Sequence, residues 1–129
     1  MREIAVRTRA RRELVDITQK VAEVARESDA DGIWLVYVPH TTAGVTINEG
    51  ADPDVATDIV MALESAVPDR QPWKHAEGNS PAHVMSTLVG SSVLVAFENG
   101  ELVLGTWQSI FFCEFDGPRS RQVWLRPLG

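Results

Sequence analysis

The chain has 129 residues, 44% of them hydrophobic and 23% charged, so it is long and apolar enough to fold as one domain over residues 1–129. Its formal net charge of −6 argues against a nucleic-acid binder, which normally carries a basic stripe. The longest apolar run, Ile33–Val38, is far shorter than the ~20 residues that cross a bilayer. Because there is one cysteine, Cys113, and no signal-peptide pattern, we expect a cytoplasmic protein that binds neither membrane nor nucleic acid.

The first half of the chain alternates predicted strands with one amphipathic helix. Glu3–Thr8 has the period of a strand. Apolar residues recur at helical spacing in Glu13–Ser28, and the turn Asp29–Gly32 closes this helix. Ile33–Val38 has the composition of a buried strand, and Val45–Asn48 alternates like a second one.

The second half contains two predicted helices followed by strands. A helix is expected over Asp52–Pro68, because an N-cap acid precedes proline at the first helical position, and another over Asn79–Gly90. Two hairpins follow, pairing Ser92–Phe97 with Glu101–Leu104 across Asn-Gly, and Thr106–Phe115 with Arg119–Pro127 across Asp-Gly-Pro. The sequence therefore predicts a compact α+β domain with a largely antiparallel sheet and about three helices.

The first candidate site lies at the end of a predicted strand. His40 follows Ile33–Val38, and an imidazole can hold a metal or move a proton near neutral pH. Thr41 and Thr42 add hydroxyl groups beside it. The alternative is that this segment is only a polar loop.

The second candidate site surrounds the start of the third predicted helix. His75 and His83 flank Asn79 and Ser80 at a helix start, where free backbone N–H groups suit a phosphate. The spacing of the histidines matches no familiar zinc signature. In the alternative interpretation, Asn79 and Ser80 only cap the helix, and His83 bonds to a backbone carbonyl.

Two arginines of the last strand form the third candidate. Arg119 and Arg121 are two residues apart, share one face of a strand, and could clamp a phosphate or diphosphate. Salt bridges to Glu114 or Asp116 are the alternative. Cys113 alternates in step with the residues that form the packing face of its predicted strand. It is therefore expected in the core rather than as a nucleophile.

Three separated blocks of the sequence together resemble the YjbQ-like family, whose members are often described as secondary thiamine-phosphate synthases. The blocks run in the family's order and span nearly the whole chain. They are Val38–Gly44 with Asn48-Glu49 and Asp52-Pro53, His75 with Gly78–His83, and Leu104–Gln108 with Glu114, Asp116–Arg119 and Arg121.

The resemblance implies a homotrimer with a site near the subunit boundaries, a divalent metal (Mg²⁺ or Zn²⁺) and a small phosphorylated ligand. It implies that His40, His75 and His83 approach one another as metal ligands. It also implies catalytic roles for His40, His83 and Arg119. The residues expected to hold the ligand are Thr41, Thr42, Asn79, Ser80, Gln108 and Arg121.

By this resemblance, the expected activity joins a pyrimidine-methyl diphosphate to a thiazole phosphate and releases pyrophosphate. The metal and the two arginines would stabilise the leaving diphosphate, and the thiazole nitrogen would attack the methylene carbon without a protein nucleophile. A metal- or anion-binding protein whose synthase activity is incidental or absent is a second hypothesis. A structural trimer without a ligand is a third.

Overall fold

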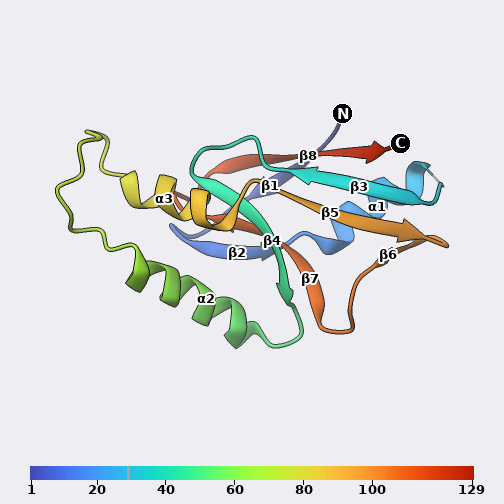
Figure 1. Cartoon of the computed structure of the whole chain (residues 1–129), viewed down its shortest axis with the longest axis horizontal. Helices are drawn as coiled ribbons and strands as arrows, with labels where there is room; N and C mark the ends of the chain where they lie inside the picture. The colour runs from blue at the N-terminus through green and yellow to red at the C-terminus, as the bar shows by residue number, and fades with distance from the viewer. Residues whose placement is uncertain (29) are drawn as a thin grey trace.

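Two antiparallel sheets make up the body of the computed structural model, which describes residues 1–28 and 30–129 (Figure 1). The five-stranded sheet has the order β1 (Arg2–Arg7), β8 (Ser120–Leu128), β3 (Gly32–Tyr37), β5 (Ser92–Glu98) and β6 (Glu101–Val103). The three-stranded sheet has the order β2 (Glu13–Asp16), β7 (Gln108–Glu114) and β4 (Ala43–Glu49). The helices are α1 (Thr18–Ser28), α2 (Pro53–Ala66) and α3 (Ser80–Val89). The predicted α+β domain with antiparallel pairing and three helices is confirmed.

The helix predicted over Glu13–Ser28 is wrong in its first turn. Residues 13–16 are a strand, in which Leu14 lies opposite Cys113 of β7. Asp16 then accepts hydrogen bonds from the backbone N–H and hydroxyl of Thr18, where α1 begins. Pairing with a distant strand therefore overrides the helical spacing of these apolar residues, and Asp29 of the predicted closing turn lies outside the described residues.

One of the two predicted hairpins is present and the other is not. β5 and β6 pair across Asn99 and Gly100, which have φ values of 53° and 79° as a tight hairpin turn requires. In contrast, β7 pairs with β2 and β4, whereas β8 pairs with β1 and β3. The segment between β7 and β8 thus crosses from one sheet to the other, and each of the two strands is paired along both edges with other strands.

Gly117 makes this crossover possible. A Cβ atom at this position would lie 2.4 Å from the carbonyl oxygen of Ala10 and 2.9 Å from the hydroxyl of Thr8. Its backbone N–H donates to the carbonyl of Arg11 at 2.9 Å. The crossover is therefore pressed against the segment between β1 and β2, and only glycine fits there.

The hydrophobic core has two parts. The larger part fills the space between the sheets and α1, and includes Trp34, Val36, Phe97, Phe112 and Leu125. The smaller part lies under α3 and contains Val67, Ala82, Met85, Cys113 and Phe115. Cys113 is buried as predicted, and burial raises the pKa of its thiol to about 12.

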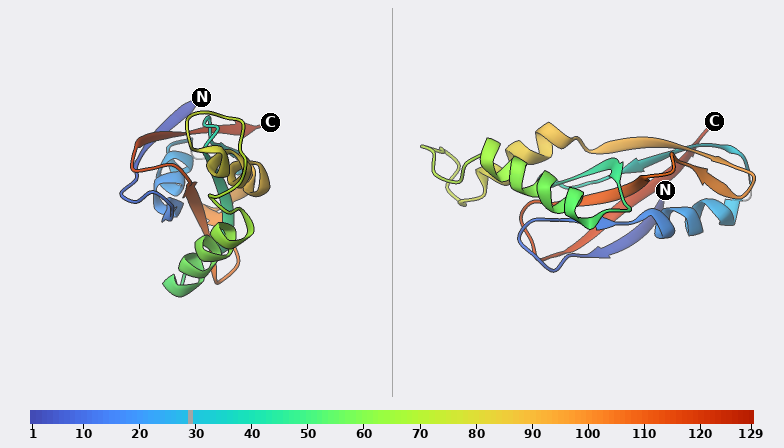
Figure 2. Two further views of the ribbon diagram at one scale, coloured as in Figure 1. Left: turned by 90° about the vertical axis from the view of Figure 1, so that its left-hand side faces the viewer. Right: turned by 90° about the horizontal axis from the view of Figure 1, so that it is seen from below.

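The helices α2 and α3 lie at one end of the molecule, and the loop between them projects beyond that end (Figures 1 and 2). α2 begins as predicted, with the side chain of Asp52 accepting from the N–H of Asp54 and Pro53 in the first turn. α3 begins after Asn79, but this side chain makes no capping bond to the described backbone. Among the described residues, no helix combines the length and apolarity needed to cross a membrane.

Candidate functional site

A cavity of about 370 Å³ lies where the connection from β3 to β4, the start of α3 and the start of β8 meet. Its lining comes from segments far apart in the sequence. The residues are Pro39, His40, Thr41, Thr42, Glu77, Asn79, His83, Arg119 and Arg121. Seven residues predicted as site members on three separate blocks are thus brought to one pocket, which we call the anion pocket.

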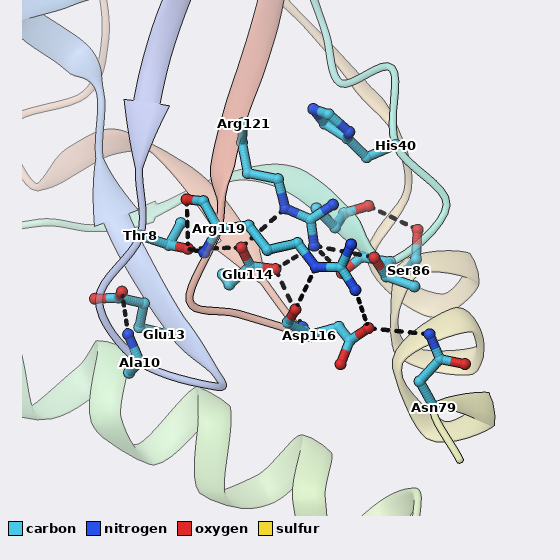
Figure 3. A network of polar contacts seen from close by, with 12 residues as sticks. Thr8, Ala10, Glu13, His40, Asn79, Ser86, Glu114, Asp116, Arg119 and Arg121 are labelled. Atoms are coloured by element: carbon cyan, nitrogen blue, oxygen red, sulfur yellow. Dashed lines mark hydrogen bonds and ion pairs between the residues drawn. The ribbon is translucent and has the colours of Figure 1, made fainter. Parts of the chain in front are cut away.

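The floor of the anion pocket is a buried ion pair that joins the two sheets, from β7 to β8. Glu114 is fully buried, and its carboxylate accepts from Nε of Arg121 at 2.9 Å and from Nη2 of the same guanidinium (Figure 3). The carboxylate also accepts from the hydroxyl of Thr8 at 2.7 Å and the N–H of Asp116 at 3.1 Å. Burial alone would raise the pKa of Glu114, but the hydrogen bonds from Arg121, Thr8 and Asp116 together lower it below its ordinary value.

Arg121 is held in one orientation and keeps one donor free. Besides the bonds to Glu114, its Nη2 donates to the hydroxyl of Thr42 at 2.9 Å. Only 4% of the Arg121 side chain is exposed, although it lines the pocket. Among the described residues, Nη1 has no hydrogen-bond partner. This atom is therefore the donor that Arg121 can offer to a ligand.

Arg119 forms a second, more exposed tier of the pocket. Its Nη2 donates to Oδ2 of Asp116 at 2.7 Å, and its Nε donates to the Asp116 carbonyl at 2.7 Å. Asn79 donates to the same carboxylate oxygen at 3.0 Å, while its own Oδ1 is buried without a partner among the described atoms. Both predicted arginines therefore line the pocket, and both also form the salt bridges that were the alternative.

His40 is tied to the five-stranded sheet. Its Nε2 accepts a hydrogen bond from the backbone N–H of Gln122 in β8 at 3.0 Å. The ring thus takes the place that a backbone carbonyl would occupy if β3 continued beyond its last residue. The ring also meets Phe112 edge-on, with ring centroids 6.5 Å apart. Burial and the nearby charge of Arg121 lower the pKa of His40 below 6.5. His40 is therefore neutral at pH 7, with Nδ1 as its remaining polar atom.

His75 and His83 meet each other without His40. Their rings are perpendicular, with centroids 5.3 Å apart, and Nε2 of His75 lies 3.4 Å from a carboxylate oxygen of Glu77. His83 and Glu77 line the anion pocket, whereas His75 does not. Across the described parts of the chain, no three histidine, cysteine or acidic side chains are grouped to hold a metal ion. One chain alone thus does not form the predicted three-histidine centre.

Two predicted ligand-binding residues lie outside the pocket lining. Ser80 is the first residue of α3. Gln108 begins β7, where its side chain accepts from the N–H of Gly105 at 2.8 Å and stabilises the connection from β6. Sequence reasoning missed Glu77 as a lining residue and Thr8 as a support of Glu114. The signal for Glu114 was present, because a carboxylate interrupted an otherwise apolar strand face.

The pocket combines hydrogen-bond donors with little net charge. Each guanidinium already faces a carboxylate, and Glu77 adds a further negative charge at the rim. Nη1 of Arg121, the hydroxyl of Thr41 and the ring of His83 can still contact a ligand. This arrangement suits a phosphate group that receives directed hydrogen bonds, and it places an imidazole where a proton could be delivered.

The comparisons with known proteins place the sequence among relatives of the same length. The family model described as UPF0047 protein YjbQ-like matches residues 2–129. UPF0047 protein MJ1081 of Methanocaldococcus jannaschii is 50% identical over 125 residues, covering 96% of this chain and 91% of the relative. UPF0047 protein YugU of Bacillus subtilis is 45% identical over 131 residues, covering 100% of this chain and 99% of the relative.

Solved structures have the same fold. The structure of an uncharacterized yjbq/upf0047 family protein from Clostridium acetobutylicum is 47% identical and superposes with a TM-score of 0.96, covering 99% of this chain and 100% of the other. The conserved hypothetical protein TT1486 from Thermus thermophilus is 44% identical, with a TM-score of 0.94 over 99% of this chain and 100% of the other.

Proposed function

Because the chain belongs to the UPF0047 (YjbQ-like) family, we propose that the anion pocket is an active site for a phosphorylated small molecule and that its reaction releases diphosphate. One observation supports this most directly. Arg121 is fixed by a fully buried carboxylate and keeps Nη1 for a ligand, beside Arg119 and His83. A hydrogen-bond donor that is held in place before the ligand arrives loses little conformational freedom on binding. It can therefore stabilise the charge that develops in a transition state.

The specific reaction we propose is of the thiamine-phosphate synthase type. The lone pair of a thiazole nitrogen forms a bond to the methylene carbon of a pyrimidine-methyl diphosphate. The carbon–oxygen bond breaks at the same carbon, and its electron pair leaves with the diphosphate. Arg119 and Arg121 donate to the departing oxygens, and His83 supplies a proton or hydrogen bond to them.

Within one chain, the described residues offer no ready site for the predicted divalent metal. Nε2 of His40 accepts from Gln122, and His75 lies beside Glu77 rather than beside His40. The proposed step therefore draws its positive charge from the two guanidinium groups, and the metal, Mg²⁺ or Zn²⁺, stays a prediction.

A second function is favoured by the charge of the pocket. Both guanidinium groups are already paired with carboxylates, so little positive charge remains to stabilise a departing diphosphate. An anion-binding protein without turnover would need only the directed donors. This alternative predicts binding of phosphate or diphosphate with no product formed.

We further propose that the protein is cytoplasmic and assembles as a homotrimer, as the family resemblance implies. The outward face of the five-stranded sheet supports assembly. Ile33 and Leu128 lie opposite each other on β3 and β8 and are 41% and 44% exposed, and Leu94 on β5 is 59% exposed. Exposed apolar side chains gathered on one face of a sheet are typical of interfaces between chains.

The activity is tested by supplying the purified protein with both substrates and Mg²⁺ and measuring thiamine phosphate by chromatography. We expect product from the wild type and at least a tenfold lower rate from Arg119→Gln and His83→Gln, since each loses one contact to the transition state. Arg126→Gln, an exposed arginine further along β8, is the matched control. Equal rates for all four proteins would overturn the site, and diphosphate binding by calorimetry without product would favour the second function.

A further inference from the structure

A second cavity, of about 520 Å³, lies between α2 and the three-stranded sheet and shares no lining residue with the anion pocket. Its walls are Leu14 and Phe111 from the sheet and Val60 and Met61 from the helix. Further lining residues come from the helix and from the rim: Arg12, Glu13, Asp16, Glu49, Gly50, Asp52, Pro53, Ala56, Thr57 and Glu64. We call this cavity the α2 groove. It has an apolar interior and a polar rim.

The helix that forms one wall is poorly covered by its own chain. None of the fourteen described residues of α2 is buried, and Met61 is 61% exposed. Helices of this length gain most of their stability by packing an apolar face against another surface. The groove-lining residues of α2 recur at intervals of three and four, so they form one such face. That face is left open beside the groove.

The rim of the α2 groove is negatively charged. Five of its residues are carboxylates: Glu13, Asp16, Glu49, Asp52 and Glu64. Its one cation, Arg12, is only 4% exposed and is already paired with Glu64 at 3.1 Å and Asp69 at 2.9 Å. An occupant of this groove should therefore present an apolar group flanked by positive charges.

The chain carries a segment of that kind. The loop between α2 and α3 projects from the body, and every residue from 68 to 78 is exposed (Figures 1 and 2). At its centre Trp73 is 37% exposed and lies between Arg70 and Lys74, which form no ion pair with any described residue. The indole N–H donates to the carbonyl of Asp69 at 3.0 Å, so the loop itself orients the ring.

Within one chain this loop touches only the rim of the α2 groove. Asp69, at the start of the loop, pairs with Arg12 of the rim at 2.9 Å, whereas Arg70, Trp73 and Lys74 are not among the lining residues. The loop leaves the C-terminal end of α2 and extends past it (Figure 1). The α2 residues that line the groove run from Pro53 to Glu64. With the loop in this conformation, contact between Trp73 and the interior of the groove therefore requires a second molecule.

We propose that the loop of one copy of this chain docks in the α2 groove of the next. Trp73 enters the apolar interior, and Arg70 and Lys74 face the carboxylates of the rim. Buried tryptophans flanked by complementary charge are frequent anchors of interfaces. Because the two surfaces differ, each copy offers one loop and one groove, and such contacts close into a ring when the rotation between copies allows it. This inference adds a pair of surfaces to the exposed sheet face of the proposed homotrimer, and it does not depend on the proposed reaction.

The test is the mass of the particle in solution, measured by light scattering after size-exclusion chromatography. We expect the wild type at a multiple of 14.2 kDa and Trp73→Ala at the mass of one chain. Trp107→Ala, which removes another exposed tryptophan (65%), should keep the wild-type mass. Thr57→Arg puts a bulky cation in the groove and should also give single chains, whereas Asp58→Arg, next to it but outside the lining, should not. Circular dichroism confirms that each variant is folded.

A mixing experiment makes the test specific. Trp73→Ala keeps an intact groove and Thr57→Arg keeps an intact loop, so a mixture should form one-to-one pairs at twice the mass of 14.2 kDa. Failure of the mixture to pair, or an unchanged mass for Trp73→Ala, overturns the docking proposal and leaves the homotrimer standing. If the wild-type protein has the mass of a single chain, both the docking proposal and the homotrimer are overturned. The proposed reaction is tested separately by the synthase assay.

Discussion

Replacing Glu114 with glutamine tests the floor of the anion pocket. Glutamine has nearly the same shape but no charge, so the guanidinium of Arg121 would stay buried without a counter-ion. Arg121 is 4% exposed and Glu114 is 0% exposed, so water cannot take over the role of the carboxylate. The hydroxyl of Thr8 and the N–H of Asp116 would also bond to a weaker acceptor.

The size of the effect follows from the burial of the pair. Removing one partner of a buried ion pair typically destabilises a protein by about 3–5 kcal/mol. Small domains are stable by about 5–15 kcal/mol, so this is a large share of the total. With an unfolding entropy of about 2.1 cal/mol/K per residue, a loss of about 4 kcal/mol lowers the Tm by roughly 15 °C for a chain of this length.

The assay is urea denaturation at pH 7, followed by circular dichroism. The control is Glu27→Gln, which removes the carboxylate of the Arg2–Glu27 pair, where both side chains are at least half exposed. Such surface pairs contribute at most about 1 kcal/mol. If Glu114→Gln costs no more than this control, the buried pair is not what joins β7 to β8, and the fixed orientation of Arg121 loses its basis.

Three further predictions concern single positions. The pKa of His40 lies below its unfolded value of 6.5, so the unfolded chain takes up the proton first as the pH falls. The stability that neutral His40 contributes is therefore lost below about pH 6.5. Between pH 8 and pH 5, the urea midpoint of His40→Gln should fall less steeply than that of the wild type. Gly117→Ala should destabilise by about 1–3 kcal/mol because its Cβ would meet Ala10 and Thr8, whereas Gly32→Ala, with open space around it, should change thermal stability by less than half of that. Cys113, with its thiol pKa raised to about 12 by burial, should react with a maleimide only as fast as the protein unfolds, and labelling at pH 8 within seconds in the folded protein would contradict its position in the core.

Local chemistry in the sequence was sufficient for some elements and not for others. The cap of α2 depends on Asp52 and its neighbours, and the β5–β6 turn depends on Asn99 and Gly100, so short-range reasoning predicts both. The strand β2 and the crossover at Gly117 depend on partners that are distant in sequence. The spacing of apolar residues along a strand does not reveal which sheet the strand will join.

The candidate site shows the same division. Small polar and glycine neighbours drew attention to His40 and His83, and the two-residue spacing from Arg119 drew attention to Arg121. These residues converge on one pocket. Gln108 has an equally polar character, but its bond to Gly105 is a matter of backbone geometry that composition does not reveal. The separation of His40 from His75 likewise depends on the path of the projecting loop.

The anion pocket is built from parts of unequal exposure. Its floor, Arg121 with Glu114, is locked between strands, whereas Glu77 at its rim belongs to a loop with no buried residue from 68 to 78. Sequence changes in that loop can therefore reshape the mouth of the pocket without disturbing the grip on an anion beneath it. Relatives that keep this floor while varying the loop would bind the same anionic group. They would differ in the rest of the ligand that they accept.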